Sequence, residues 1–281
     1  MDDKQKLGLG LGLHSQMQAP YLYYYGSEVD NTGTPIAENI DNIGLVKSMH
    51  VVGSFDRLLG AFSRLKAEVY YQYLYDLPVA ASGSSFSLIN SGAGFSRFFP
   101  EELTIGGNGR NYGVELTVER FFTQGYYFLV TASLFDSKYR TLENVWRNTS
   151  FNGRYAVNGL VAKEWVFKKG SSFNIGTNIT SVGGGWYGQV DLVQSTLQQD
   201  VIYQDETVNT IKFRPYFRQD IRLAYKINSK KITHEIAIDI VNIFDTENIL
   251  KKTFAPDHPQ GPVVDEFQLG RLPLFYYRID F

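Results

Sequence analysis

The sequence predicts an all-β fold, an antiparallel meander of about ten transmembrane strands that forms part of an outer-membrane β-barrel. The first observation is that apolar and polar residues alternate with a period of two in one segment after another, as in strands with a single apolar face. The second is that long and short connections alternate along the whole chain, like the extracellular loops and periplasmic turns of such barrels. The third is the last stretch, 269–281, where aromatic and apolar residues share one face up to Phe281.

The composition excludes several classes of protein. The absence of cysteine rules out a disulfide scaffold, a thiolate metal site and a cysteine nucleophile. The net charge of −2, with Lys and Arg scattered, offers no basic surface for nucleic acid. No run of about 18 apolar residues is present that would make a spanning helix. Aromatic residues make up 15% of the chain, and the interfaces of membrane barrels are rich in them.

The first strand is predicted at residues 7–13, where four leucines alternate with three glycines. The spacing GxGxG lacks the later glycine of a dinucleotide-binding loop, and no strand precedes it, so a strand is the better interpretation. Residues 1–6 contain no apolar segment of the kind found in a secretory signal. Taken alone this start indicates a cytoplasmic protein, but the barrel pattern leads us to expect a fragment whose export signal lies upstream.

The remaining strands follow in order, separated by connections of alternating length. Long loops are expected near 15–44, 76–111, 181–213 and 244–266, with one of medium length before 155, and tight turns near 123–125, 168–171 and 228–230. The strands are expected at about 45–55, 65–75, 112–118, 126–135, 155–167, 173–179, 221–227, 232–240 and 275–281.

The two faces of these strands differ in chemistry. In the fourth strand Val114 and Leu116 are expected to point outward, with Glu115 on the opposite side. We interpret Glu115, Glu119 and Glu235 as charges in a water-filled lumen and not as catalytic carboxylates. A charged Arg or Lys on the lipid face costs about 2–4 kcal/mol at the midplane, so charge is expected inside.

Several stretches together resemble a known family, the TonB-dependent outer-membrane receptors, in the C-terminal part of the β-barrel as it occurs in Bacteroidetes-type sequences. The stretches that carry this resemblance are Leu65–Pro78, Asn111–Glu119, Asn148–Tyr155, Asp239–Asn248 and the strand that ends at Phe281. The first four are similar to the family's strand and loop junctions. The last is similar to the signal that the outer-membrane assembly machinery reads, formed here by Phe275, Tyr277, Ile279 and Phe281.

The resemblance implies a receptor of which this chain is one part. Family members have 22 strands closed around an N-terminal plug that contacts TonB, so residues 1–281 are expected to be a single, incomplete domain without a plug. The intact parent would take up a scarce nutrient, such as a ferric siderophore, cobalamin or a glycan, with TonB-coupled energy. The implied partners are outer-membrane lipid, the TonB complex through the missing plug, the assembly machinery and an unknown small ligand. No cofactor, no nucleic acid and no enzymatic activity are expected.

Candidate ligand contacts are aromatic residues in two of the long loops. The same residues could instead belong to an interfacial belt or pack within the loops. They are Tyr21, Tyr23, Tyr24 and Tyr25 in the first loop and Trp186 and Tyr187 in the third. The histidines at 14, 50, 234 and 258 show no metal-ligand spacing, so no metal site is predicted.

Two other interpretations remain open from the sequence. One is a self-contained ten-stranded outer-membrane hydrolase using His14 and His258, although no Gly-x-Ser-x-Gly motif is present. The other is a soluble all-β binding module, which would bury the 7–13 and 275–281 faces in one core. If the chain is instead part of a larger barrel, its first and last strands lack neighbours, and we expect a curved, open sheet.

Overall fold

The structure is a computed structural model that describes residues 4–26, 29–33, 36, 39–92, 101–167, 170–229 and 231–281. Ten long strands form one antiparallel meander in which each strand pairs with the next. In spatial order they are β1 (Gln5–Gln16), β2 (Val46–Leu58), β3 (Ser63–Ala80), β4 (Leu103–Thr123), β5 (Tyr126–Arg140), β7 (Tyr155–Val166), β8 (Ser172–Val182), β11 (Tyr216–Asn228), β12 (Thr233–Val241) and β15 (Leu272–Asp280). All ten expected strands are therefore confirmed.

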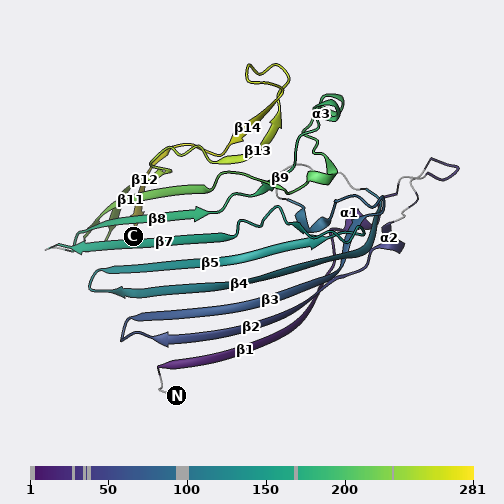
Figure 1. The fold of residues 1–281 in the computed structure, drawn as a ribbon. Helices are drawn as coiled ribbons and strands as arrows, with labels where there is room; N and C mark the ends of the chain where they lie inside the picture. Colours follow the sequence, from purple (N-terminus) through teal and green to yellow (C-terminus); the bar gives the residue numbers. More distant parts are fainter. Residues whose placement is uncertain are drawn as a thin grey trace.

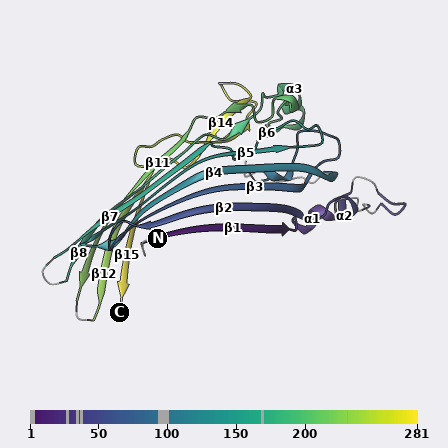
Figure 2. The ribbon, with the colours of Figure 1, turned by 60° about the horizontal axis from the view of Figure 1, so that its bottom comes forward.

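The sheet is curved and open. Within the described residues β1 pairs only with β2 and β15 only with β12, so these two strands form its free edges. Figures 1 and 2 show the curvature and the succession of strands from β1 to β15. This is the open sheet that we expected from ten strands of a larger barrel.

The connections alternate between short and long, as the sequence indicated. At one end of the sheet, short turns join β2 to β3, β4 to β5, β7 to β8 and β11 to β12. The long connections gather at the other end, on the right of Figure 1. The middle of two expected turns, at 168–169 and at 230, lies outside the described residues.

The register places apolar side chains on one face across all ten strands. Leu9 lies opposite Gly53, Val69 opposite Val114, and Val114 opposite Leu134. The same face continues through Ile236, which lies opposite Tyr277. We call this the apolar face, and the opposite side, which holds Glu68 and Glu115 in direct register, the polar face.

The apolar face is not buried in a core. Leu9 is 76% exposed and Phe275 is 73% exposed, and many other residues of this face are exposed too. The soluble-module interpretation required both faces to share one core, and it is wrong in this respect. None of the helices in the described part of the chain is long and apolar enough to cross a membrane.

A small core lies instead beneath the long loops. Buried Leu22, Ile43, Leu88 and Leu103 pack together there. Buried Asn39 holds the segments together, because its amide nitrogen donates to the carbonyls of Leu22 (3.0 Å) and Glu101 (2.9 Å) and its side-chain oxygen accepts from the Leu103 amide (2.7 Å).

The loops contain secondary structure that the sequence interpretation missed. The strands β3 and β4 also extend well into the region expected to be a loop at 76–111. The additional elements are α1 (Pro20–Tyr23), α2 (Asn39–Asn42), η1 (Leu88–Asn90), β6 (Arg147–Asn148), β9 (Trp186–Tyr187), α3 (Leu192–Gln198), η2 (Asp205–Thr207), β10 (Ile211–Lys212), β13 (Ile249–Phe254) and β14 (Val263–Phe267). Among them, β9 pairs with β10 and β13 with β14 in two small two-stranded sheets, and β6 pairs with β5.

Candidate functional site

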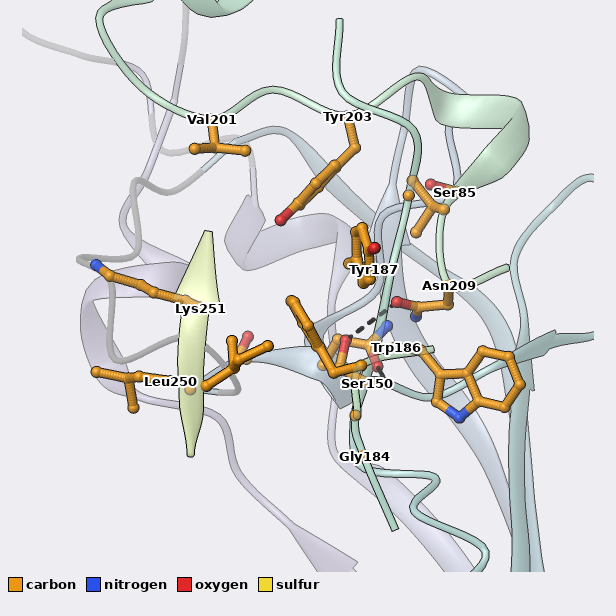
Figure 3. Close-up of a pocket in the computed structure, with 18 of the residues that line it drawn as sticks. Ser85, Ser150, Gly184, Trp186, Tyr187, Val201, Tyr203, Asn209, Leu250 and Lys251 are labelled. Carbon is orange, nitrogen blue, oxygen red and sulfur yellow. Dashed lines mark hydrogen bonds between the residues drawn. The ribbon is translucent and has the colours of Figure 1, made fainter. Parts of the chain in front are cut away.

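A cavity of about 750 Å³ lies among the long loops. Four connections contribute to its wall: the β3–β4, β5–β7, β8–β11 and β12–β15 loops. Figure 3 places Tyr187 between Tyr203 and Ser150, with Leu250 and Lys251 of β13 on another side of the cavity. The site is therefore built from segments that lie far apart in the sequence.

Aromatic rings form the centre of this cavity. The rings of Tyr187 and Phe213 stack with their centroids 4.2 Å apart and an interplanar angle of 25°. Tyr203 tilts against Tyr187 at 6.2 Å. The ammonium of Lys252 lies 5.4 Å from the centroid of the Tyr187 ring. Such a cluster offers flat apolar surfaces with polar edges, which suits a ligand that contains rings.

Backbone pairing and a tight glycine contact position the central rings. Tyr187 of β9 lies in register with Ile211 of β10, which places Phe213 beside it. A Cβ atom at Gly184 would lie 1.9 Å from the carbonyl oxygen of Phe213, so only glycine allows the two backbones to approach this closely. The indole of Trp186 donates to the carbonyl of Asn152 at 2.6 Å, which fixes its orientation.

Polar contacts between loops hold the wall of the cavity in place. The carboxylate of Asp205 accepts from the backbone amide (3.0 Å) and the hydroxyl (2.6 Å) of Ser85. The side chain of Asn209 donates to the carbonyl of Asn148 at 2.7 Å, and the side chain of Asn148 donates to the carbonyl of Asn209 at 3.2 Å. Because these bonds join different loops, the cavity is largely pre-organised.

The charges near the cavity are mostly paired. Lys251 lies 3.8 Å from Glu266, and Lys252 lies 2.7 Å from Asp265. Burial raises the pKa of the Tyr203 hydroxyl to about 12, so this group remains a neutral hydrogen-bonding phenol at neutral pH. The cavity therefore has no strong excess of one charge sign, and it offers mainly ring surfaces and hydrogen-bonding groups.

The structure separates the two sets of predicted ligand contacts. Trp186 and Tyr187 line the cavity. The four tyrosines of the first loop, Tyr21, Tyr23, Tyr24 and Tyr25, lie in and beside α1 and do not line it. Tyr23 packs against the small core, and its hydroxyl donates to the carbonyl of Gly44 at 3.2 Å. A role in ligand contact stays a prediction for both sets.

Sequence reasoning missed Tyr203, Phe213 and Ser85 as members of the site. Each is a single residue in a long loop, with no local pattern to mark it. The signal that was available is the glycine run 183–185 directly before Trp186, because consecutive glycines indicate a close backbone approach.

Two of the four histidines come together, which their sequence spacing did not indicate. His14 and His50 lie on paired strands with ring centroids 4.8 Å apart. The side chain of Gln72 lies 2.9 Å from the Nε2 atom of His50. Among the described residues no group of three or more His, Cys, Asp or Glu side chains could hold a metal ion. The cavity lining, within the same residues, includes no histidine, so His14 and His258 are not at this site.

The polar face carries a network of charges near the short-turn end of β11, β12 and β15. Glu235, with a side chain only 5% exposed, accepts from the hydroxyl of Tyr276 at 2.6 Å and lies 3.1 Å from both Arg222 and Arg278. Arg222 also contacts Asp239 at 2.8 Å. Glu119 pairs with Arg64 at 3.2 Å on the same face. The three carboxylates expected in the lumen, those of Glu115, Glu119 and Glu235, therefore lie on the polar face.

The residues of the predicted assembly signal share the apolar face of the edge strand β15. Phe275 lies in register with Ile238, and Ile279 with His234. The hydroxyl of Tyr277 is 2.7 Å from the Nδ1 atom of His234. Phe281 follows the strand and is exposed. Nothing in this geometry tests recognition by an assembly machinery, which stays a prediction.

Comparisons with known proteins give matches at the level of structure. No protein-family model and no curated protein sequence matches the chain. Among solved structures, the ferric yersiniabactin uptake receptor FyuA from Yersinia pestis has a TM-score of 0.64 at 15% identity, over 100% of this chain and 36% of the receptor. The copper transporter OprC has a TM-score of 0.60 at 15% identity, over 100% of this chain and 38% of the transporter.

A third match is the ferric preacinetobactin receptor BauA from Acinetobacter baumannii, with a TM-score of 0.59 at 12% identity over 99% of this chain and 34% of the receptor. The chain thus spans about a third of the length of the solved structures that it matches. At these identities the likeness shows the fold: the meander is that of part of the barrel of TonB-dependent outer-membrane receptors. The Bacteroidetes-type character stays a prediction.

Proposed function

We propose that this chain is a section of the barrel wall of a bacterial outer-membrane uptake receptor, and that its long loops bind the cargo at the cell surface. The observation that carries the proposal is the combination of an exposed apolar face with an aromatic cavity at the long-loop end of the same sheet. The matched structures, which are named as receptors and a transporter, support the same function.

The exposed apolar face supports a place in a membrane. Leucine, valine and aromatic side chains cover this face on all ten strands, and water is a poor solvent for a surface of that size. Lipid would cover it, while the charged networks around Glu235 and Arg64 would face an aqueous lumen. The long-loop end would then lie outside the cell and the short turns in the periplasm.

The free edges of β1 and β15 support a barrel wall with more strands than these ten. Unpaired amide and carbonyl groups in lipid lack any partner, so an open edge is strongly unfavourable there. We infer that further strands of the intact protein pair with β1 and β15 and close the barrel. A plug inside the closed barrel would contact TonB, and Phe275, Tyr277, Ile279 and Phe281 would present the strand that the assembly machinery reads.

The side chains that line the cavity suit a cargo that contains rings. Tyr187, Tyr203 and Phe213 offer stacking surfaces, and Ser85, Ser150 and Asn209 offer hydroxyl and amide groups nearby. Cobalamin, glycans and many ferric siderophores combine rings with polar edges, so all three classes fit this chemistry. The carbonyl and phenol groups provide recognition only, and no bond is made or broken in the cargo.

A binding panel tests this function. The protein that contains the chain, purified from membranes in nonionic detergent, is titrated with a ferric catecholate, a ferric hydroxamate, cyanocobalamin and a mixture of oligosaccharides. We expect saturable binding of one class, with the others at least about tenfold weaker. Saturable binding of none of the four would contradict the cargo role, and a detergent-free monodisperse protein would contradict the membrane location.

The hydrolase alternative receives no support from the geometry. It needs a histidine and a carboxylate next to a nucleophile at one rim. His14 faces His50 on the sheet, whereas His258 lies in the tip of the β13–β14 hairpin, where its Nδ1 atom accepts from the Gln260 amide at 3.3 Å. The two histidines therefore belong to separate places, and neither lines the cavity.

A further inference from the structure

A group of cations lies on the apolar face at its long-loop end, where the apolar side chains stop. Arg110 of β4 and Lys138 of β5 are in direct register on this face. Arg140 follows Lys138 on the same side of β5, in register with Asn108. Like charges directly opposite each other on neighbouring strands are destabilising, so this arrangement calls for an anion.

These three cations have no acidic partner within the described residues. No ion pair within 4.0 Å is formed by Arg110, Lys138 or Arg140 there, and Arg140 donates only to the side chain of Asn108, at 3.0 Å. Asp136, two residues before Lys138 on this face, interacts electrostatically with Lys138, but its ion pair is with Arg154 at 2.7 Å. Asp136 also accepts from the Tyr112 hydroxyl at 3.0 Å and from Asn152 at 2.8 Å.

Other charged side chains at the long-loop end of the sheet form ion pairs. Lys47 pairs with Asp76 at 2.9 Å, and Glu143 is occupied by Arg147. Arg147 lies in register with Tyr139, whose side chain is on the opposite side of β5 from Lys138. The group formed by Arg110, Lys138 and Arg140 therefore keeps a net charge of three positive units on the outer surface. We call it the rim cluster.

An aromatic side chain fixes the geometry of the rim cluster. The guanidinium of Arg110 lies 4.4 Å from the ring centroid of Trp146, and that of Arg140 lies 5.2 Å from the same ring. The Nε atom of Arg110 is buried without a hydrogen-bond partner. Holding two guanidinium groups around one indole orders them in advance, and their remaining N–H groups are available to an acceptor.

The position of the rim cluster matches the boundary of a hydrocarbon layer. On the same face of β4, Tyr112, Val114, Leu116 and Val118 separate Arg110 from Arg120. The step of ten residues from Arg110 to Arg120 spans about 33 Å along a strand. At a strand tilt of about 40° this is a height of about 25 Å, which is the apolar band of an outer-membrane barrel.

We propose that the rim cluster binds the phosphate groups of a phosphorylated lipid headgroup in the outer leaflet, with the acyl chains lying against the apolar face below. Guanidinium groups form paired, charge-assisted hydrogen bonds with phosphate oxygens. The apolar surface that begins at Val114 and Leu134, just below the cations and the Asp136–Arg154 pair, favours a lipid over a free anion, because both parts of the molecule then have a partner. This proposal rests on the membrane location in the proposed function but is independent of the cargo.

The test is an equilibrium titration of the detergent-purified protein with diphosphoryl lipid A. The comparison ligands are the same lipid without its phosphates, and inorganic phosphate. We expect saturable binding of diphosphoryl lipid A, at least about tenfold weaker binding of the dephosphorylated lipid, and no competition by millimolar phosphate. Removing each cation should weaken binding roughly fivefold, and the triple variant Arg110→Gln, Lys138→Gln, Arg140→Gln about a hundredfold.

A matched control exists at the other end of the same face. There the guanidinium of Arg120 lies 4.4 Å and the ammonium of Lys163 lies 5.3 Å from the ring centroid of Tyr126. The double variant Arg120→Gln, Lys163→Gln should change the affinity less than about twofold. If the triple variant fails to fold, as judged by the electrophoretic mobility of unheated samples, the single variants Arg110→Gln and Arg140→Gln replace it.

Several results would overturn the proposal. Unchanged binding in the rim-cluster variants, equal losses in the control, or equal affinity for the dephosphorylated lipid would each exclude a specific phosphate site. Competition by inorganic phosphate at the affinity of the lipid would assign the cluster to a free anion. Cargo binding measured in the same samples separates this outcome from failure of the proposed function, because the cavity does not include the rim cluster.

Discussion

Tyr187 and Phe213 stack face to face with their ring centroids 4.2 Å apart, and this pair joins the β9 strand to the segment that follows β10. The pair is the centre of the cavity, so it provides the most direct test of cargo binding. Tyr187→Ala should weaken binding of the cargo identified in the panel about tenfold, because the stacking surface is lost. Tyr187→Phe should retain most of the affinity.

The control for this prediction is Tyr24→Ala, an exposed tyrosine beside α1 that does not line the cavity. The Tyr24→Ala variant should bind the cargo with the same affinity as the unmodified protein. A larger loss from Tyr24→Ala than from Tyr187→Ala would move the binding site to the first loop, where the four tyrosines were predicted.

Glu235 should be the most important single carboxylate for the stability of the described wall. Glu235→Gln leaves Arg222 and Arg278 without their shared partner, at a cost of about 3 kcal/mol. Urea unfolding from lipid vesicles, followed by tryptophan fluorescence, measures this loss. Asp280→Asn removes another partner of Arg278, but both side chains are about half exposed, so that change should cost less than about 1 kcal/mol. Equal effects of the two variants would argue against a structural role of the network.

The turn between β4 and β5 depends on a glycine. Gln124 and Gly125 have φ angles of 52° and 76°, and a Cβ at Gly125 would lie 2.5 Å from the carbonyl oxygen of Glu164. Gly125→Ala should therefore destabilise the protein by about 1 kcal/mol or more in the same urea experiment. Gly159→Ala in β7 is the control, because a Cβ there meets no atom within 4 Å, and its stability should be unchanged or higher.

Because of Tyr203, the stability of the folded protein should fall at alkaline pH. Its pKa is raised from 10.0 to about 12 by burial, so the folded state disfavours the phenolate. A raised pKa contributes stability that is fully present below pH 10, the unfolded value, and is lost as the pH rises through about 12. Spectrophotometric titration of the phenols should show a late component, and Tyr203→Phe should reduce its amplitude by one phenol. A titration curve that Tyr203→Phe leaves unchanged at the alkaline end would contradict this.

The ten strands could be predicted because each carries its own alternating pattern. Val114, Glu115 and Leu116, for example, fix a period of two without any tertiary information. The β13–β14 hairpin could not be predicted in this way. It lies within a long loop, and its Lys251 and Lys252 break any alternation, so pairing of these short strands depends on the surrounding loops.

The candidate site was half predictable for the same reason. Trp186 and Tyr187 stand together as adjacent aromatic residues and were recognised as loop aromatics. Tyr203 and Phe213 join them only through the β9–β10 pairing and the close approach at Gly184, which are tertiary contacts. The tyrosine cluster lies in the long loop expected at 15–44, but the sequence interpretation missed the one-turn helix α1 there, although Pro20 is a typical first helical residue.

The proposed membrane location requires that the apolar face contacts lipid while the opposite face contacts water. The chain contains no cysteine, so a single cysteine at each position from 114 to 119 of β4 can carry an environment-sensitive fluorophore in lipid vesicles. Labels at Val114, Leu116 and Val118 should be quenched by a lipid-soluble quencher, and labels at Glu115, Thr117 and Glu119 by a water-soluble one. Uniform quenching by the water-soluble agent at all six positions would contradict the claim.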